Sequence, residues 1–129
     1  MKILKVLFIL MCLNSLAYAD KNMKIGSLGK DSEVSRVIKV IMYDNYYEPN
    51  SFQIKAGETI KFEVENAGEL VHEFNIANKM MHTKHQPEME RMVENEILFA
   101  DSIDKDKMKK MSKMDKSLGH SHSNSVLLE

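Results

Sequence analysis

The stretch KAGETIKFEVENAGELVHEFNIA, residues 55–77, decides the fold class. Residues 59–65 alternate between apolar and charged side chains, which is the pattern of a strand with one buried face. A glycine-bearing turn follows, and residues 70–77 alternate again. The side chains on one face of this second run are Leu70, His72, Phe74 and Ile76. The first run predicts a half-buried antiparallel strand, and the second run predicts another strand after the turn.

Further strands are predicted on both sides of this stretch. Residues 34–43 are rich in β-branched side chains, and residues 51–54 form a short apolar run after a turn that contains Pro49. Residues 126–128 look like the start of another strand. Four to five strands with short turns predict an all-β fold, an antiparallel β-sandwich that is incomplete because such sandwiches have about seven strands.

Residues 78–122 interrupt the strand pattern with a charged, methionine-rich and histidine-rich sequence of mostly helical period. Pro87, which precedes two glutamates, predicts the first turn of a helix. Residues 104–116 predict a second helix that stops near Gly119. We therefore expect a helical insertion at 78–122 within a partial domain that covers residues 34–129.

The N-terminus has the pattern of a secretory signal peptide. Two lysines precede an apolar run at residues 6–16, and Ala-Tyr-Ala at 17–19 predicts cleavage before Asp20. The apolar run is shorter than the roughly 20 residues that span a bilayer. A lipoprotein anchor at Cys12 is less favoured, because bulky residues precede this cysteine. We expect residues 1–19 to be removed, residues 20–33 to form a flexible lead-in, and the product to be periplasmic without stable membrane insertion.

Charge and cysteine content exclude several classes of function. The chain carries 18 basic and 19 acidic residues, and loss of the two lysines in the signal peptide leaves a net charge of about −3. Without a basic face, nucleic acid is not expected as a partner. The single cysteine, Cys12, lies in the signal peptide. Disulfides and thiolate metal ligands are therefore not expected after cleavage.

Methionine and histidine supply the remaining candidate metal ligands. In an oxidising compartment without cysteine, thioether and imidazole groups are suited to Cu(I). The candidates are Met80, Met81, His82, His85, Met89, Met92, Met108, Met111, Met114, His120 and His122. A second interpretation is that the methionines form the apolar faces of amphipathic helices. The pattern does not decide between the two.

His72 also has two interpretations, because it occupies an inward-facing strand position. Burying an imidazole is costly unless its nitrogens are hydrogen-bonded or metal-bound. The stretch YEPNSFQIKAGETIKFEVENAGELVHEFNI, residues 47–76, resembles the first half of a cupredoxin of the plastocyanin and azurin superfamily. It is most similar to periplasmic copper-resistance cupredoxins, in which a similar strand ends in His-Glu-Phe. The resemblance implies a Greek-key β-sandwich and makes His72 the main copper ligand.

The same resemblance shows what this chain lacks. In that family a cysteine, a second histidine and a methionine near the C-terminus complete the site, and no positions here match them. A blue-copper centre needs a His₂Cys plane with a weak axial ligand. We therefore expect no blue centre in this chain, and we interpret Glu129 as a premature, truncated end.

These observations predict a periplasmic copper-binding protein of the cupredoxin type that acts in copper tolerance or trafficking. Copper, as Cu(I) or Cu(II), is the expected cofactor, and a periplasmic copper transporter or oxidase is the expected protein partner. Blue-copper electron transfer in a full-length form and a metal-free structural or partner-binding module stay open. No acid–base or nucleophile pair is visible, and we expect no enzymatic activity.

Overall fold

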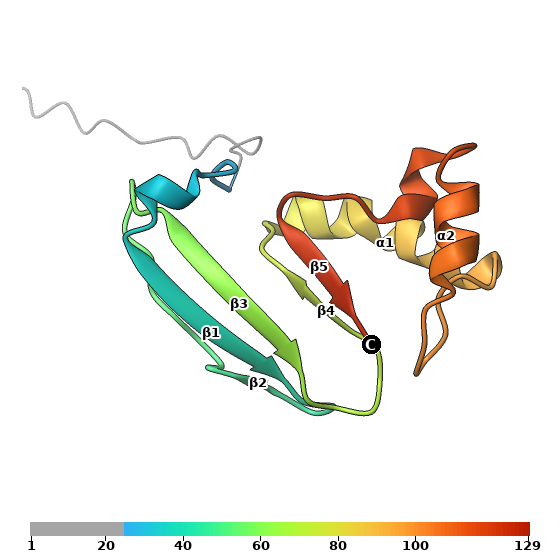
Figure 1. Ribbon diagram of the computed structural model, residues 1–129, viewed down its shortest axis with the longest axis horizontal. Coiled ribbons are helices and arrows are strands. Elements are labelled where there is room, and N and C mark those ends of the chain that lie inside the picture. The colour runs from blue at the N-terminus through green and yellow to red at the C-terminus, as the bar shows by residue number, and fades with distance from the viewer. Residues whose placement is uncertain (1–24) are drawn as a thin grey trace, which may run out of the picture.

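The computed structural model describes residues 25–129, and Figure 1 shows its layers. The predicted signal peptide and the first part of the predicted lead-in lie outside the described residues. The elements, in chain order, are η1 (Asp31–Glu33), β1 (Arg36–Met42), β2 (Tyr47–Glu48), β3 (Ile60–Asn66), β4 (His72–Asn75), α1 (Lys79–Glu94), α2 (Lys105–Met111), η2 (Lys116–Gly119) and β5 (Ser125–Leu128).

The strands form two small sheets. One sheet has the order β2-β1-β3, and β4 pairs with β5 in the other. Figure 1 shows the antiparallel β4–β5 pair between the three-stranded sheet and the helices, which come from the segment between β4 and β5. Strands in two sheets with one helical segment confirm the predicted all-β class, a partial sandwich with a helical insertion.

The pairing of β1 with β3 corrects the prediction of antiparallel strands throughout. These two strands are parallel, with Val40 opposite Val64. A parallel pair requires a connection that crosses back to the start of the first strand. Residues 43–59 make that crossover, and β2 pairs antiparallel with β1 on its other edge. The strand predicted at residues 51–54 is not formed, because this part of the crossover has no ladder partner.

Alternation along β1 and β3 is confirmed. Val40 and Met42 on β1 are fully buried, whereas Lys39 points outward and pairs with Glu65 of β3 at 2.9 Å. The inward side chains of β3 contact the β4–β5 pair through aromatic rings, since the ring centroids of Phe62 and Phe74 of β4 are 5.3 Å apart. The alternation therefore places the apolar side chains of β3 on the face that contacts the other sheet.

Helix α1 begins earlier than the sequence predicts. The side chain of Asn78 caps it by accepting a hydrogen bond from the Met81 amide at 2.8 Å, so Pro87 lies inside the helix rather than at its start. Proline has no amide hydrogen, and the helix loses one internal hydrogen bond at this point. The cap and the packing of the opposite face outweigh that loss. Helix α2 ends at Met111, earlier than the predicted 116, and the short η2 follows.

A second apolar core lies within the helical segment, which we define as residues 79–119. Its fully or nearly buried members are Met92, Ile97 and Leu118, and the side chains packed against them are Met89, Leu98, Met108, Met111 and Leu127. Leu127 belongs to β5, so this core also attaches the helical segment to the β4–β5 pair. Within residues 25–129, no helix has the length and apolar character needed to cross a bilayer.

Candidate metal centre

Strand β4 directs two neighbouring side chains to opposite faces, as a strand must. His72 faces the three-stranded sheet, where it meets Asp44 and the ring of Tyr47. Glu73 faces the helical segment, where it meets His85 and His120. The His-Glu pair in the sequence therefore serves two separate sites.

The first site contains one histidine and one carboxylate. The ring nitrogen Nε2 of His72 donates to Asp44 Oδ1 at 2.9 Å, and the His72 side chain is 13% exposed. Asp44 also accepts hydrogen bonds from the amides of Glu69 and Leu70. Gly68 permits this approach, because a Cβ atom there would lie 2.1 Å from Asp44 Oδ1. The turn before β4 thus fixes the carboxylate, and the carboxylate fixes the imidazole.

Hydrogen bonding leaves the second nitrogen of His72 available. Nδ1 has no hydrogen-bond partner among the described residues, and it is not a fully buried atom. The hydrogen bond from His72, followed by those from the Leu70 and Glu69 amides, holds the pKa of Asp44 below its ordinary value. Both interpretations of His72 are therefore met in part: one nitrogen is satisfied by protein, and the other can still bind a metal.

The second site is a cluster of three histidines and two glutamates. Its members, which we call the histidine–glutamate cluster, are Glu73, His85, Glu88, His120 and His122. They come from β4, from α1 and from the connection between η2 and β5. Figure 1 shows this connection passing across α1 to reach β5. Three segments that are distant in sequence therefore contribute to one group of ligand atoms.

One triangle of atoms forms the inner part of the cluster. Glu73 Oε1 lies 2.8 Å from His85 Nε2 and 3.0 Å from His120 Nε2, and the two nitrogens are 3.3 Å apart. Bonds of about 2.0–2.1 Å to one metal ion would separate neighbouring ligand atoms by about 2.8 Å at right angles and about 3.3 Å at the tetrahedral angle. The triangle therefore fits three adjacent ligand positions around an ion. In the metal-free protein, the two imidazole nitrogens are instead hydrogen-bonded to the Glu73 carboxylate oxygen.

A second carboxylate lies on the other side of His85. Glu88 Oε2 is 3.5 Å from His85 Nδ1, and the Glu88 carboxylate lies 2.9–3.0 Å from His122 Nε2. His85 is thus linked to Glu73 through Nε2 and to Glu88 through Nδ1. Because each nitrogen of the His85 ring faces a different carboxylate, His85 belongs to both halves of the cluster. The cluster contains one chain of contacts rather than two independent sites.

Burial and charge differ across the cluster. The exposed side-chain fractions are 4% for His120, 9% for His85 and 39% for His122. His122 lies at a cleft of about 230 Å³ that is also lined by Met81, His85 and Glu88, so the cleft reaches one of the three inner residues, His85. Burial raises the pKa of Glu73, but the hydrogen bonds and charges of His120 and His85 together outweigh it and lower that pKa.

Local structure explains how the cluster residues converge. Residues three and four apart share one face of a helix, and in α1 this face contains Met81, His85, Glu88 and Met92. His120 follows η2 with a left-handed backbone, φ 44° and ψ 48°. Histidine adopts this conformation more often than most residues, although it is uncommon. The turn directs the imidazole inward to Glu73.

The predicted ligands have several different environments. The cluster includes His85, His120 and His122, whereas His82 is exposed and His72 lies at the separate Asp44 site. Met81 lines the cleft, and half-buried Met80 does not. Met92 is fully buried in the helical core, and Met89, Met108 and Met111 pack against that core.

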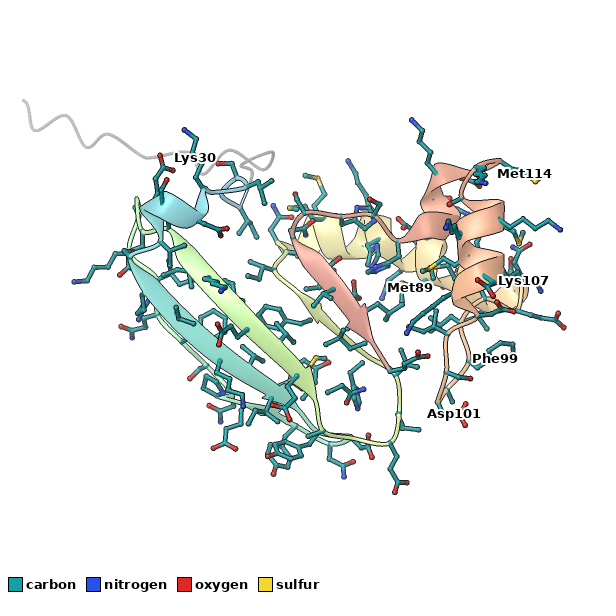
Figure 2. The ribbon with its side chains drawn as sticks, in the orientation of Figure 1. Lys30, Met89, Phe99, Asp101, Lys107 and Met114 are labelled. Atoms are coloured by element: carbon teal, nitrogen blue, oxygen red, sulfur yellow. The ribbon has the colours of Figure 1, made fainter. Side chains whose placement is uncertain are left out.

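Met114 is 86% exposed, and Figure 2 shows it at the outer edge of the helical segment, whereas Met89 lies at the inner end. The packing supports the amphipathic interpretation for the core methionines. Metal binding by any of the predicted ligands stays a prediction.

Sequence reasoning missed the two glutamates of the cluster. Glu73 directly follows His72, and the sequence marks it only as part of the His-Glu-Phe motif. Glu88 is three residues after His85, the spacing that places two helical side chains on one face. That spacing was the available signal for Glu88. Nothing in the linear pattern indicates that Glu73 meets His120, which is 47 residues away.

Comparison with known proteins agrees with the strand architecture and with the residues around His72. The family model described as "Cupredoxin-like domain" matches residues 5–98, and the chain belongs to this family of β-sandwich proteins. It is similar to two proteins, both named copper-resistant cuproprotein CopI. Identity to the protein from Pseudomonas aeruginosa is 40% over 73 residues, which cover 57% of this chain and 40% of that relative.

Identity to the protein from Rubrivivax gelatinosus is 28% over 74 residues, which cover 57% of this chain and 45% of that relative. The chain therefore spans less than half the length of both curated relatives. No solved structure matches the chain. The resemblance to copper-resistance cupredoxins is confirmed at the level of the family and of these named relatives.

Proposed function

We propose that this cupredoxin-like chain is a periplasmic copper-binding protein that acts in copper resistance by sequestering or transferring copper, and that it is not an enzyme. The observation that carries the proposal is the convergence of His85 Nε2, His120 Nε2 and Glu73 Oε1 within hydrogen-bond distance. Membership of the cupredoxin-like family and similarity to proteins named for copper resistance support copper as the metal.

The available ligand types define what such a site can do. Imidazole and carboxylate groups bind copper without a thiolate, and the only cysteine of the chain is Cys12. Binding therefore requires neutral histidines and an ionised carboxylate, and it weakens as pH falls. The partly exposed His122 offers a route for exchange with a protein partner. We propose a periplasmic copper transporter or oxidase as that partner.

Equilibrium titration with copper against a competing chelator tests the proposal. The purified protein is expected to bind copper, and His85→Ala is expected to weaken binding by at least about 100-fold, since even residues that only support a ligand contribute 10–100-fold. His82→Ala is the matched control, because His82 lies on the same helix but is exposed and outside the cluster. It is expected to leave the affinity unchanged.

Two results would contradict the proposal. Failure of the unmodified protein to bind copper more tightly than a free histidine-containing peptide would remove the function itself. Equal loss of binding in His82→Ala and His85→Ala would remove the assignment to the cluster. Retained folding of both variants, measured by circular dichroism, is the required control.

A second candidate function rests on the hydrogen bond of His72. Metal-binding histidines commonly donate the other ring N–H to a carboxylate, as His72 does to Asp44. This arrangement favours His72 as the copper ligand that the family resemblance implies, within a blue electron-transfer site that needs a cysteine from elsewhere. The absorption spectrum of the copper-loaded protein distinguishes the two candidate functions, because only a thiolate-containing site gives intense blue absorption. We expect this chain to bind copper without a blue colour.

A further inference from the structure

The inner atoms of the histidine–glutamate cluster join three parts of the fold at a point outside the helical core. Glu73 lies on β4, His85 lies on α1, and His120 directly follows η2. Near this point Asn124 links the start of β5 to the end of β4, because its side chain donates hydrogen bonds to the Asn75 side chain and to the Ile76 carbonyl. An ion bound by the three inner residues would therefore cross-link the β4–β5 pair to α1 and to the residue that follows η2.

We propose that the cluster is a divalent-metal clasp, in which Glu73, His85 and His120 bind Cu(II) and fix the helical segment to the β4–β5 pair. Glu88 and His122 are positioning residues in this proposal. The clasp deepens the proposed function and rests on it, because it specifies the oxidation state, the ligands and the structural consequence of copper binding. No thioether is required.

Charge balance favours a divalent ion over Cu(I). The cluster contains two carboxylates, Glu73 and Glu88, whose side chains are 18% and 11% exposed, and its histidines bind metal only in their neutral form. A divalent ion neutralises both carboxylates, whereas Cu(I) leaves one negative charge uncompensated in a largely buried site. Uncompensated buried charge is costly. Carboxylate oxygen is also a poorer ligand for soft Cu(I) than thioether or imidazole.

Glu88 is assigned a positioning role by its contact with the second nitrogen of His85. A carboxylate close to Nδ1 favours the tautomer that carries its proton on Nδ1, and this tautomer leaves the Nε2 lone pair for the metal. Glu88 Oε2 is 3.5 Å from that Nδ1, and His122 holds the same carboxylate at 2.9 Å. His122 is more exposed than the other cluster histidines and lies at the cleft. The exposed end of the cluster therefore supports the inner ligand His85.

Pulsed EPR of the Cu(II)-loaded protein counts bound imidazoles and tests the ligand assignment. The unmodified protein is expected to show two. His120→Asn is expected to show one, and asparagine is chosen because it tolerates the left-handed backbone at this position. His122→Asn is expected to keep two bound imidazoles with weaker affinity. His82→Asn is the matched control and is expected to change neither quantity.

The two glutamates separate a ligand from a positioning residue. Glu73→Gln is expected to lower Cu(II) affinity by more than about 100-fold and to change the EPR parameters of the remaining complex. Glu88→Gln is expected to lower affinity by about 10–100-fold with the two-imidazole spectrum retained, as for other groups that orient a ligand. Identical EPR parameters in both variants would overturn the assignment of Glu73 as a ligand.

Thermal unfolding tests the clasp. At an excess of about 100-fold over the dissociation constant, Cu(II) or Zn(II) is expected to raise the midpoint by roughly 10 °C, and His120→Asn is expected to abolish most of this shift. A larger shift with Cu(I), or a ligand set that includes His122 in place of His120, would overturn the clasp and leave the proposed function standing. Absence of binding by any form of copper would overturn both.

Discussion

His72 and the histidine–glutamate cluster use the same local device with different results. In each, a histidine donates Nε2–H to a carboxylate at 2.8–2.9 Å. At His72 the carboxylate of Asp44 is already held by two backbone amides and faces no second imidazole. At Glu73 the carboxylate oxygen is shared by two imidazoles. Convergence of ligand atoms, rather than burial of a single histidine, distinguishes a candidate metal site within this chain.

The largest expected effect breaks this comparison directly. The double variant His85→Ala/His120→Asn removes two of three inner ligands and is expected to lower copper affinity by about 1,000-fold or more, since even a supporting group contributes 10–100-fold. His72→Ala is expected to change the affinity of this chain by less than about three-fold. Isothermal titration with a competing chelator measures both. The reverse order of effects would place the metal at His72.

The next effect separates the methionines of the helical core from metal ligands. Met92 is fully buried beside Ile97 and Leu118, so Met92→Ala is expected to lower the free energy of unfolding by about 2–5 kcal/mol in metal-free protein. Met114 is 86% exposed, and Met114→Ala is expected to change it by less than about 0.5 kcal/mol.

Urea denaturation of both methionine variants, with chelator present, provides the measurement. Equal stability of the two variants would contradict the core assignment. A loss of copper binding by Met114→Ala would revive thioether ligation at the outer edge of the helical segment.

The smallest effect concerns the pH dependence of the His72 site. The pKa of Asp44 is lowered in the folded protein, first by the hydrogen bond from His72. A lowered folded pKa stabilises the protein above the ordinary pKa of 3.8, and this contribution is lost as pH falls through the lowered value. Asp44→Asn is therefore expected to be less stable than the unmodified protein at pH 6 and to approach it in stability near pH 2.

Urea midpoints across this pH range, without metal, test the prediction for Asp44. A difference between the two proteins that stays constant from pH 6 to pH 2 would show that the Asp44 carboxylate charge has no part in fixing His72.

The sequence predicted the strands better than their partners. Alternation identifies the buried face of β3 correctly, because a period of two depends only on local geometry. It says nothing of which strand lies alongside, and the parallel pairing of β1 with β3 was missed for that reason. Pro87 was misplaced because the Asn78 cap and the packed face of α1 outweigh one lost hydrogen bond.

The candidate site was predicted only in part for a related reason. Composition identified His85, His120 and His122, since four of the five histidines lie in the helical segment or just after it. It could not identify Glu73, because the contact with His120 spans 47 residues and depends on how η2 turns toward β4. Methionine periodicity fitted both a core and a ligand set, and the packing of Met92 supports the core.

Anomalous diffraction at the copper absorption edge tests the central claim most directly, because it locates the ion without reference to any variant. In crystals of the Cu(II)-loaded protein, the peak is expected within about 2.0–2.2 Å of Glu73 Oε1, His85 Nε2 and His120 Nε2. A peak beside Nδ1 of His72, or among the methionine sulfurs, would contradict the account.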